Sequence, residues 1–184
     1  MKKIIAGFSA FMLILVSLFT LSSCTKKTFY SEWHKAGATI EKKNVFKSVT
    51  VSEVEELLKN ESKNTFALFV GNSSEAAAVS DVTAIQYAAD AKNYEGKVYF
   101  LTTTDFTSLS KKKEIKQNLS IDISEMGNNV ICVMYESGKI KYNTSITKID
   151  DSNYTQFKLK ESDKVFDITL IFEYAVAKYP LKAE

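Results

Sequence analysis

Arginine is absent from this sequence, and histidine, proline, cysteine and glycine are scarce. All 24 basic residues are lysines, and the chain contains one His, one Pro, two Cys and six Gly. Without guanidinium groups the protein has no planar fork that could bind a phosphate or a guanine edge through two parallel hydrogen bonds. This absence disfavours sequence-specific DNA binding. The scarcity of Pro and Gly excludes a low-complexity linker within the folded part.

The remaining composition is that of one globular domain without a metal or cofactor. The chain has 184 residues, of which 45% are hydrophobic and 25% are charged, the balance of a chain that folds. The single histidine, His34, has no second His or free Cys close to it in the sequence, so it does not suggest a metal site. The aspartates are scattered and lack the spacing of a calcium-binding loop.

Residues 1–23 have the features of a bacterial export signal. Lys2 and Lys3 precede 18 uncharged residues, and small residues follow. The segment Leu21-Ser22-Ser23-Cys24 resembles the lipobox of bacterial lipoproteins. That resemblance implies cleavage before Cys24 and attachment of acyl chains such as palmitate, which would anchor the protein at the extracytoplasmic face of the cell membrane. A membrane-spanning helix, or simple secretion after cleavage near Ser23, are the alternatives.

Cleavage at this point changes both the charge and the cysteine count. It removes Lys2 and Lys3 and leaves equal numbers of lysines and acidic residues, so the mature chain has no overall attraction for nucleic acid or anionic lipid. With Cys24 lipidated, Cys132 has no cysteine to pair with. It lies in an apolar run over residues 130–135 that predicts a strand buried on both faces, where it would be a small core residue. A reactive thiol is the alternative.

The mature chain divides into a tether and a domain. Residues 24–43 are rich in lysine and show no sustained periodicity, which predicts a tether that contains Trp33 and His34. Residues 44–184 alternate between strand and helix patterns in the order βαβαβαββα, with a helix near 51–58 capped by Ser52 and Glu55, and a final helix over 163–179. Residues 144–162 are interpreted as an extra strand or a long loop. The pattern predicts an α/β domain with parallel strands at the centre of the sheet and helices on both faces.

The element order resembles that of thioredoxin-like proteins, and most closely those of the bacteriocin-transport-accessory type. The resemblance rests on the segment 69–75, which opens a long helix, and on the hairpin within 133–139. It implies a three-layer thioredoxin-like fold. In the family a strand ends in an aromatic residue and Gly, and the motif G-x-x-x-C-x-x-C follows. Counted from Gly71, the two cysteines would fall at Glu75 and Ala78, so both thiols are missing and the redox activity is not expected here.

The resemblance also implies where a partner would bind. In the family the turn that opens the long helix faces the loop before the hairpin, where a cis-proline lies. Here that loop contains asparagines instead, and a trans backbone is expected because a cis bond before a non-proline residue costs about 2.5–4 kcal/mol. The candidate contact residues are Asn72, Ser73, Ser74, Glu75, Asn128 and Asn129.

These observations lead to a hypothesis of a non-catalytic binding or accessory module that contacts another protein of the cell envelope. Two alternatives from other classes stay open. One is an enzyme with a non-thiol site, which would require several titratable groups to converge in one pocket. The other is a structural or antigenic surface lipoprotein that displays loops such as residues 144–162.

Overall fold

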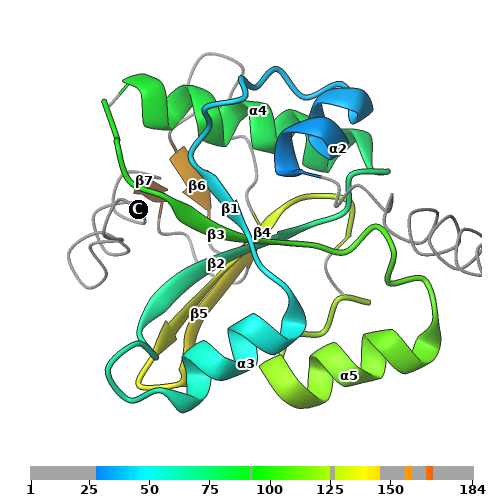
Figure 1. Ribbon diagram of the computed structural model, residues 1–184, viewed down its shortest axis with the longest axis vertical. Helices are drawn as coiled ribbons and strands as arrows, with labels where there is room; N and C mark the ends of the chain where they lie inside the picture. Colours follow the sequence, from blue (N-terminus) through cyan, green and yellow to red (C-terminus); the bar gives the residue numbers. More distant parts are fainter. Residues whose placement is uncertain (1–27, 92, 125–126, 146–155, 159–164, 168–184) are drawn as a thin grey trace, which may run out of the picture.

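The computed structural model describes residues 28–91, 93–124, 127–145, 156–158 and 165–167. The expected signal in residues 1–23 and the lipidation site Cys24 lie outside these ranges, as do most of residues 144–162. The described chain forms the following elements in order (Figure 1): α2 (Phe29–Ala36), β1 (Phe46–Ser48), α3 (Val51–Lys59), β2 (Phe66–Gly71), α4 (Ala76–Ala91), β3 (Val98–Thr102), α5 (Leu109–Leu119), β4 (Ile131–Glu136), β5 (Lys139–Ser145), β6 (Gln156–Lys158) and β7 (Val165–Asp167).

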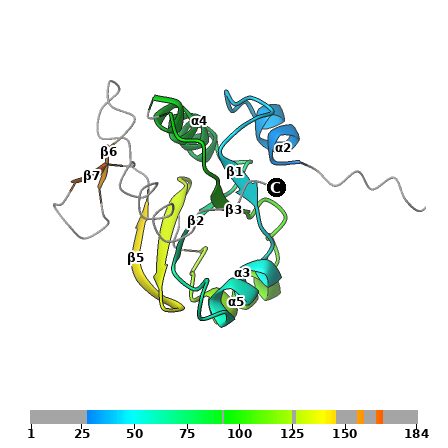
Figure 2. The ribbon, with the colours of Figure 1, turned by 60° about the vertical axis from the view of Figure 1, so that its left-hand side comes forward.

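Five strands form one mixed sheet in the order β1-β3-β2-β4-β5. β1, β3 and β2 are parallel, whereas β4 pairs antiparallel with β2 and β5 pairs antiparallel with β4. Helices α2 and α4 cover one face of this sheet, and α3 and α5 cover the other (Figures 1 and 2). The predicted α/β class is confirmed, and the arrangement is consistent with the thioredoxin-like fold. From β1 to β5 the elements follow the predicted order.

The central strand β2 is buried because both faces of the sheet are covered. All six of its residues are buried, and their side chains alternate between the two layers. Ala67 and Phe69 pack with α2 and α4, whereas Leu68 and Val70 pack with α3 and α5. The same alternation in β4 places Cys132 in the first layer, fully buried, as the apolar run predicted.

The predicted tether was wrong for most of its length, because the chain packs onto the domain from residue 28 onwards. The side chain of Thr28 accepts a hydrogen bond from the Ser31 backbone at 3.1 Å and caps α2, and Gly37 ends the helix at a positive φ of 107°. Phe29 and Trp33 are 7% and 0% exposed. An eight-residue helix that buries two aromatic side chains four residues apart gives too short a pattern for its periodicity to be recognised.

Trp33 joins α2 to the end of the central strands. Its indole Nε1 donates a hydrogen bond to Oγ1 of Thr102 at 3.1 Å, which satisfies the polar atom of an otherwise apolar side chain. Its ring packs edge-on against Phe100, with 5.1 Å between the ring centroids. Helix α2 is therefore part of the hydrophobic core and not an appendage to it.

Two further predictions were wrong in detail. The N-cap of α3 is Thr50 and not Ser52, and its capping-box partner is Glu53, so the helix begins earlier than the apolar spacing suggested. Of the expected helix over residues 163–179, the described part Val165–Asp167 is a strand, β7, paired with β6. Val and Phe favour strands when a partner is available, and this preference overrides the helical spacing. The rest of that segment lies outside the described residues.

Candidate functional site

The turn between β2 and α4 is built by the side chain of Asn72. Its Oδ1 accepts a hydrogen bond from the backbone N–H of Ser74 at 2.9 Å, and its carbonyl accepts one from the N–H of Glu75 at 3.1 Å. Such a turn lets a short polar side chain replace a backbone partner at the start of a helix. The turn is anchored to the next loop because the Thr103 N–H donates to the carbonyl of Gly71 at 2.8 Å.

The loop before β4 is held by a buried carboxylate on α4. Oδ2 of Asp81 accepts hydrogen bonds from the Val130 N–H at 2.8 Å and from Nδ2 of Asn129 at 3.1 Å. Asp81 is 6% exposed. Burial raises the pKa of Asp81 from 3.8 to about 6, although the two hydrogen bonds oppose the rise because they favour the charged form. The peptide bonds of the described residues are all trans, including those at 128–130 as predicted.

The turn and the loop face each other across a cleft of about 200 Å³. Asn72 and Glu75 line it from the turn, and Asn128 and Asn129 line it from the loop. The expectation that these two segments meet is therefore confirmed for four of the six predicted residues. Their partner-binding role stays a prediction.

The two serines of the turn do not line the cleft. Ser73 is half-buried and faces α2, where its Oγ donates to Oε1 of Glu32 at 3.0 Å and lies 2.7 Å from Oγ1 of Thr104. Ser74 is exposed. Because its Oγ is engaged by a carboxylate and a threonine, Ser73 serves to hold α2 against the turn.

Sequence analysis missed the third wall of the cleft, which comes from the segment after β3. This wall consists of three threonines, two apolar side chains and one lysine: Thr103, Thr104, Thr107, Phe106, Ile123 and Lys112. The available signal was topological, since β2 and β3 are parallel neighbours and the loops after both must leave from the same edge of the sheet. No local motif marked these residues.

The described residues of the cleft contain one carboxylate, from Glu75, and one ammonium group, from Lys112. No thiol or imidazole belongs to that described lining. Cys132 lies in the core, where burial raises the pKa of its thiol far above the usual value. Within the described ranges no three His, Cys, Asp or Glu side chains form a group that could hold a metal ion. The cleft offers hydrogen-bonding amides and hydroxyls beside an apolar patch.

No family model matches the chain, and no curated protein sequence matches it. Among the described helices, none is both long enough and apolar enough to cross a bilayer.

Proposed function

We propose that this chain is a lipid-anchored, extracytoplasmic binding module that captures another protein of the cell envelope in the cleft between residues 72–75 and 127–129. The anchor would be Cys24, on the evidence of its lipobox-like context. The observation that carries the proposal is the cleft itself: two predicted loops meet at the edge of the sheet where the parallel strands end, the usual place for ligands in α/β folds.

The chemistry of the cleft favours recognition of a polypeptide. Asn128 and Thr107 are exposed at its rim and offer amide and hydroxyl groups that can pair with a partner's backbone. Phe106 and Ile123 supply an apolar surface between them. Its volume of about 200 Å³ is below the roughly 300–1,000 Å³ typical of sites for drug-sized molecules, and it suits a projecting side chain.

The side chains that line the cleft also favour binding over catalysis. Acid–base or nucleophilic catalysis requires a nucleophile or base that a neighbouring group activates. Ser73 does not line the cleft, its hydroxyl is engaged by Glu32 and Thr104, and the described lining holds a single carboxylate. The titratable side chains of the described lining are Glu75 and Lys112, and no thiol, imidazole or serine hydroxyl lies in that lining for them to activate.

Site-specific photo-crosslinking in intact cells tests the proposal. A photoreactive phenylalanine analogue replaces Asn128 at the rim of the cleft, and the matched control carries it at Gln117, an exposed position on α5 outside the cleft. We expect a defined protein adduct from position 128 that is absent from position 117. Equal adducts from both positions, or none from position 128, would contradict the binding site. A Cys24→Ala variant with the probe at 128 separately reports whether anchoring is required.

A further inference from the structure

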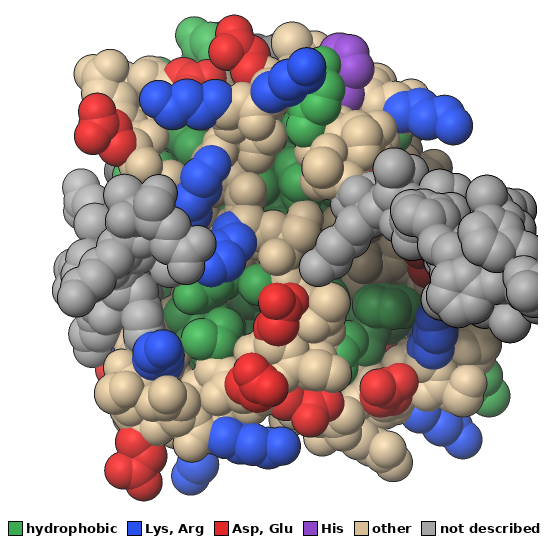
Figure 3. Space-filling model, viewed as in Figure 1, with side chains coloured by type: hydrophobic (Ala, Val, Ile, Leu, Met, Phe, Trp, Pro, Cys, Tyr) green, Lys and Arg blue, Asp and Glu red, His purple; other side chains and the backbone are tan. Residues whose placement is uncertain are grey.

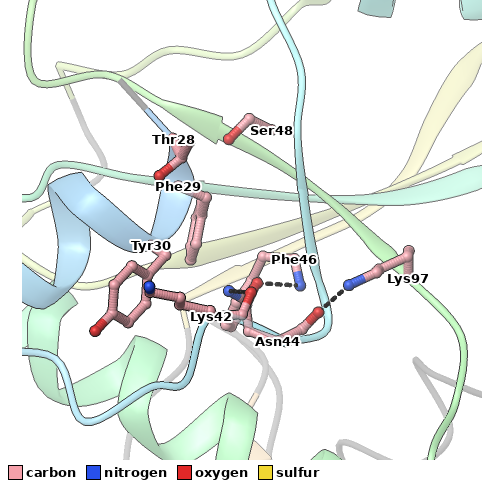
Figure 4. A pocket seen from close by; sticks show the side chains of 8 residues that line it. All are labelled: Thr28, Phe29, Tyr30, Lys42, Asn44, Phe46, Ser48 and Lys97. Carbon is pink, nitrogen blue, oxygen red and sulfur yellow. Dashed lines mark hydrogen bonds between the residues drawn. The ribbon is translucent and has the colours of Figure 1, made fainter. Parts of the chain in front are cut away.

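A second hollow, of about 490 Å³, lies between α2 and the free edge of β1 (Figure 4). In the described sheet β1 pairs only with β3, so its other edge carries no strand. The apolar part of the hollow is aromatic: Phe29 and Phe46 stack with 4.5 Å between ring centroids, and Tyr30 stands beside them. Among the described residues, none lines both the hollow and the cleft.

Asn44 is a buried polar residue at this hollow, and hydrogen bonds hold its side chain in place. It is 8% exposed, its Nδ2 donates to the carbonyl of Glu41 at 2.9 Å, and its Oδ1 accepts from the Phe46 N–H at 3.1 Å. The ammonium group of Lys97 donates to the carbonyl of Asn44. Lys42 extends on the opposite side of Asn44, beside Tyr30 (Figure 4). Two cations therefore flank a hollow in which Tyr30 is the more exposed aromatic side chain, since Phe29 and Phe46 are 7% and 5% exposed.

The lysines around this hollow form no ion pair with a described residue. The ion pairs found among the described residues include none of Lys42, Lys43 and Lys97, and no carboxylate belongs to the described lining of the hollow. Three acidic residues lie nearby without forming an ion pair with these lysines: Glu41 precedes Lys42, and Asp90 and Glu95 line an adjacent hollow together with Lys43 and Lys97. Burial, and to a lesser extent the charge of Lys43, lowers the pKa of Lys97. Lysine side chains gather over β1 and β3 on the face shown in Figure 3.

The short stretch of chain between Cys24 and Thr28 keeps this hollow close to the expected anchor. Thr28 lines the hollow and is four residues from Cys24 in the sequence. Four residues span at most about 14 Å when fully extended. A chain acylated at Cys24 would hold the hollow at the membrane surface, because the segment expected to be a tether up to residue 43 is folded from residue 28.

We propose that this hollow, with Lys42, Lys43 and Lys97, is the membrane-facing surface of the anchored domain and binds the phosphate headgroups of anionic phospholipids. The proposal rests on the anchoring proposed for Cys24. The half-buried Tyr30 beside Lys42 suits the interface between headgroups and acyl chains. Each lysine near an anionic surface strengthens binding about fivefold.

The experiment uses the full-length lipoprotein, purified from membranes and reconstituted into vesicles of phosphatidylcholine with or without phosphatidylglycerol. A spin label is attached to Cys at Ser48→Cys in the hollow, or at Gln117→Cys on α5 as the control. Cys24 would carry the lipid and Cys132 is buried, so the label reports one site. In vesicles that contain phosphatidylglycerol, we expect position 48 to be less accessible than position 117 to a polar relaxation agent. In vesicles of phosphatidylcholine alone, we expect no such difference. Lys42→Gln with Lys43→Gln, which removes two positive charges, should lower the ratio of membrane-docked to undocked domain about thirtyfold, whereas Lys111→Gln with Lys113→Gln should not.

The outcomes separate the two proposals. The mass of the N-terminal peptide reports whether Cys24 is acylated, and an unmodified Cys24 would refute the anchoring. If Cys24 is acylated but position 48 is as accessible as position 117, the anchor stands and the membrane-facing surface is wrong. Protection of position 48 that needs an added protein and not anionic lipid would also overturn it, because the free edge of β1 would then be a protein-binding edge.

Discussion

Asp81 makes the fold less stable at neutral pH than at mildly acidic pH. The carboxyl is buried on α4 and has a pKa of about 6, against 3.8 for an exposed aspartate. Below pH 3.8 it is protonated in both the folded and the unfolded chain. Between the two values the unfolded chain releases the proton and the folded chain keeps it, so stability falls as pH rises through this window. Above pH 6 both states are ionised and the loss is complete.

The size of this effect follows from the difference between the two pKa values. About two pH units correspond to about 3 kcal/mol of unfolding free energy. Asp81→Asn keeps an oxygen that can accept from Asn129 and from the Val130 N–H, but it has no charge to bury. We therefore expect Asp81→Asn to match the wild type near pH 4 and to exceed it by up to about 3 kcal/mol at pH 7. Asp81→Ala also lacks the charge but removes the acceptor, so it should be about 1–3 kcal/mol less stable than Asp81→Asn, because the buried Val130 N–H is left unpaired.

Urea unfolding at pH 4, 5, 6 and 7, followed by circular dichroism, measures these differences. Asp105→Asn is the matched control, since Asp105 is exposed and the same substitution there removes a charge without removing a buried one. If the stability of the wild type relative to Asp81→Asn stays constant or increases between pH 4 and 6.5, the assignment of a raised pKa to Asp81 is refuted. Equal behaviour of the Asp81→Asn and Asp105→Asn variants would refute it as well.

Two other predictions follow from buried side chains. Trp33→Ala should lose about 3–5 kcal/mol in urea unfolding, because the indole is fully buried and bonded to Thr102, whereas His34→Ala, exposed on the same helix, should change stability by less than about 1 kcal/mol; equal effects would mean that α2 is not part of the core. The thiol of Cys132 should not react with an aromatic disulfide reagent in the native protein and should react fully in 6 M guanidinium, and rapid native labelling would contradict its burial.

The sequence predicted the sheet because burial on both faces leaves an obvious pattern. The runs at residues 65–71 and 130–135 are uncharged and short, and they became the central strands β2 and β4. Helix α2 was missed because it buries few residues and depends on tertiary contacts, above all those of Trp33 with Phe100 and Thr102. Such contacts lie 67 or more positions away in the chain and leave no local pattern.

The candidate site was predictable only in part, for a similar reason. The turn at residues 72–75 and the loop at 128–129 were located from the element order, and they do meet. The orientation of Ser73 was not predictable, because it depends on Glu32 in a helix that the sequence did not reveal. The threonines after β3 belong to the cleft only because β2 and β3 are adjacent, a fact of strand order and not of composition.

Asp81 also explains how the cleft keeps its shape without the features expected from the resemblance. In thioredoxin-like proteins a cis-proline shapes the loop before the hairpin, whereas here the backbone at 128–130 is trans and bonded to a carboxylate. The carboxyl group that accepts these hydrogen bonds can change its protonation state with pH, whereas a proline ring cannot. Protonation of Asp81 would remove the charge that strengthens both bonds and so loosen the wall formed by Asn129. The described linings of the cleft and of the lysine-flanked hollow have no residue in common, so the two proposed sites can be occupied at the same time.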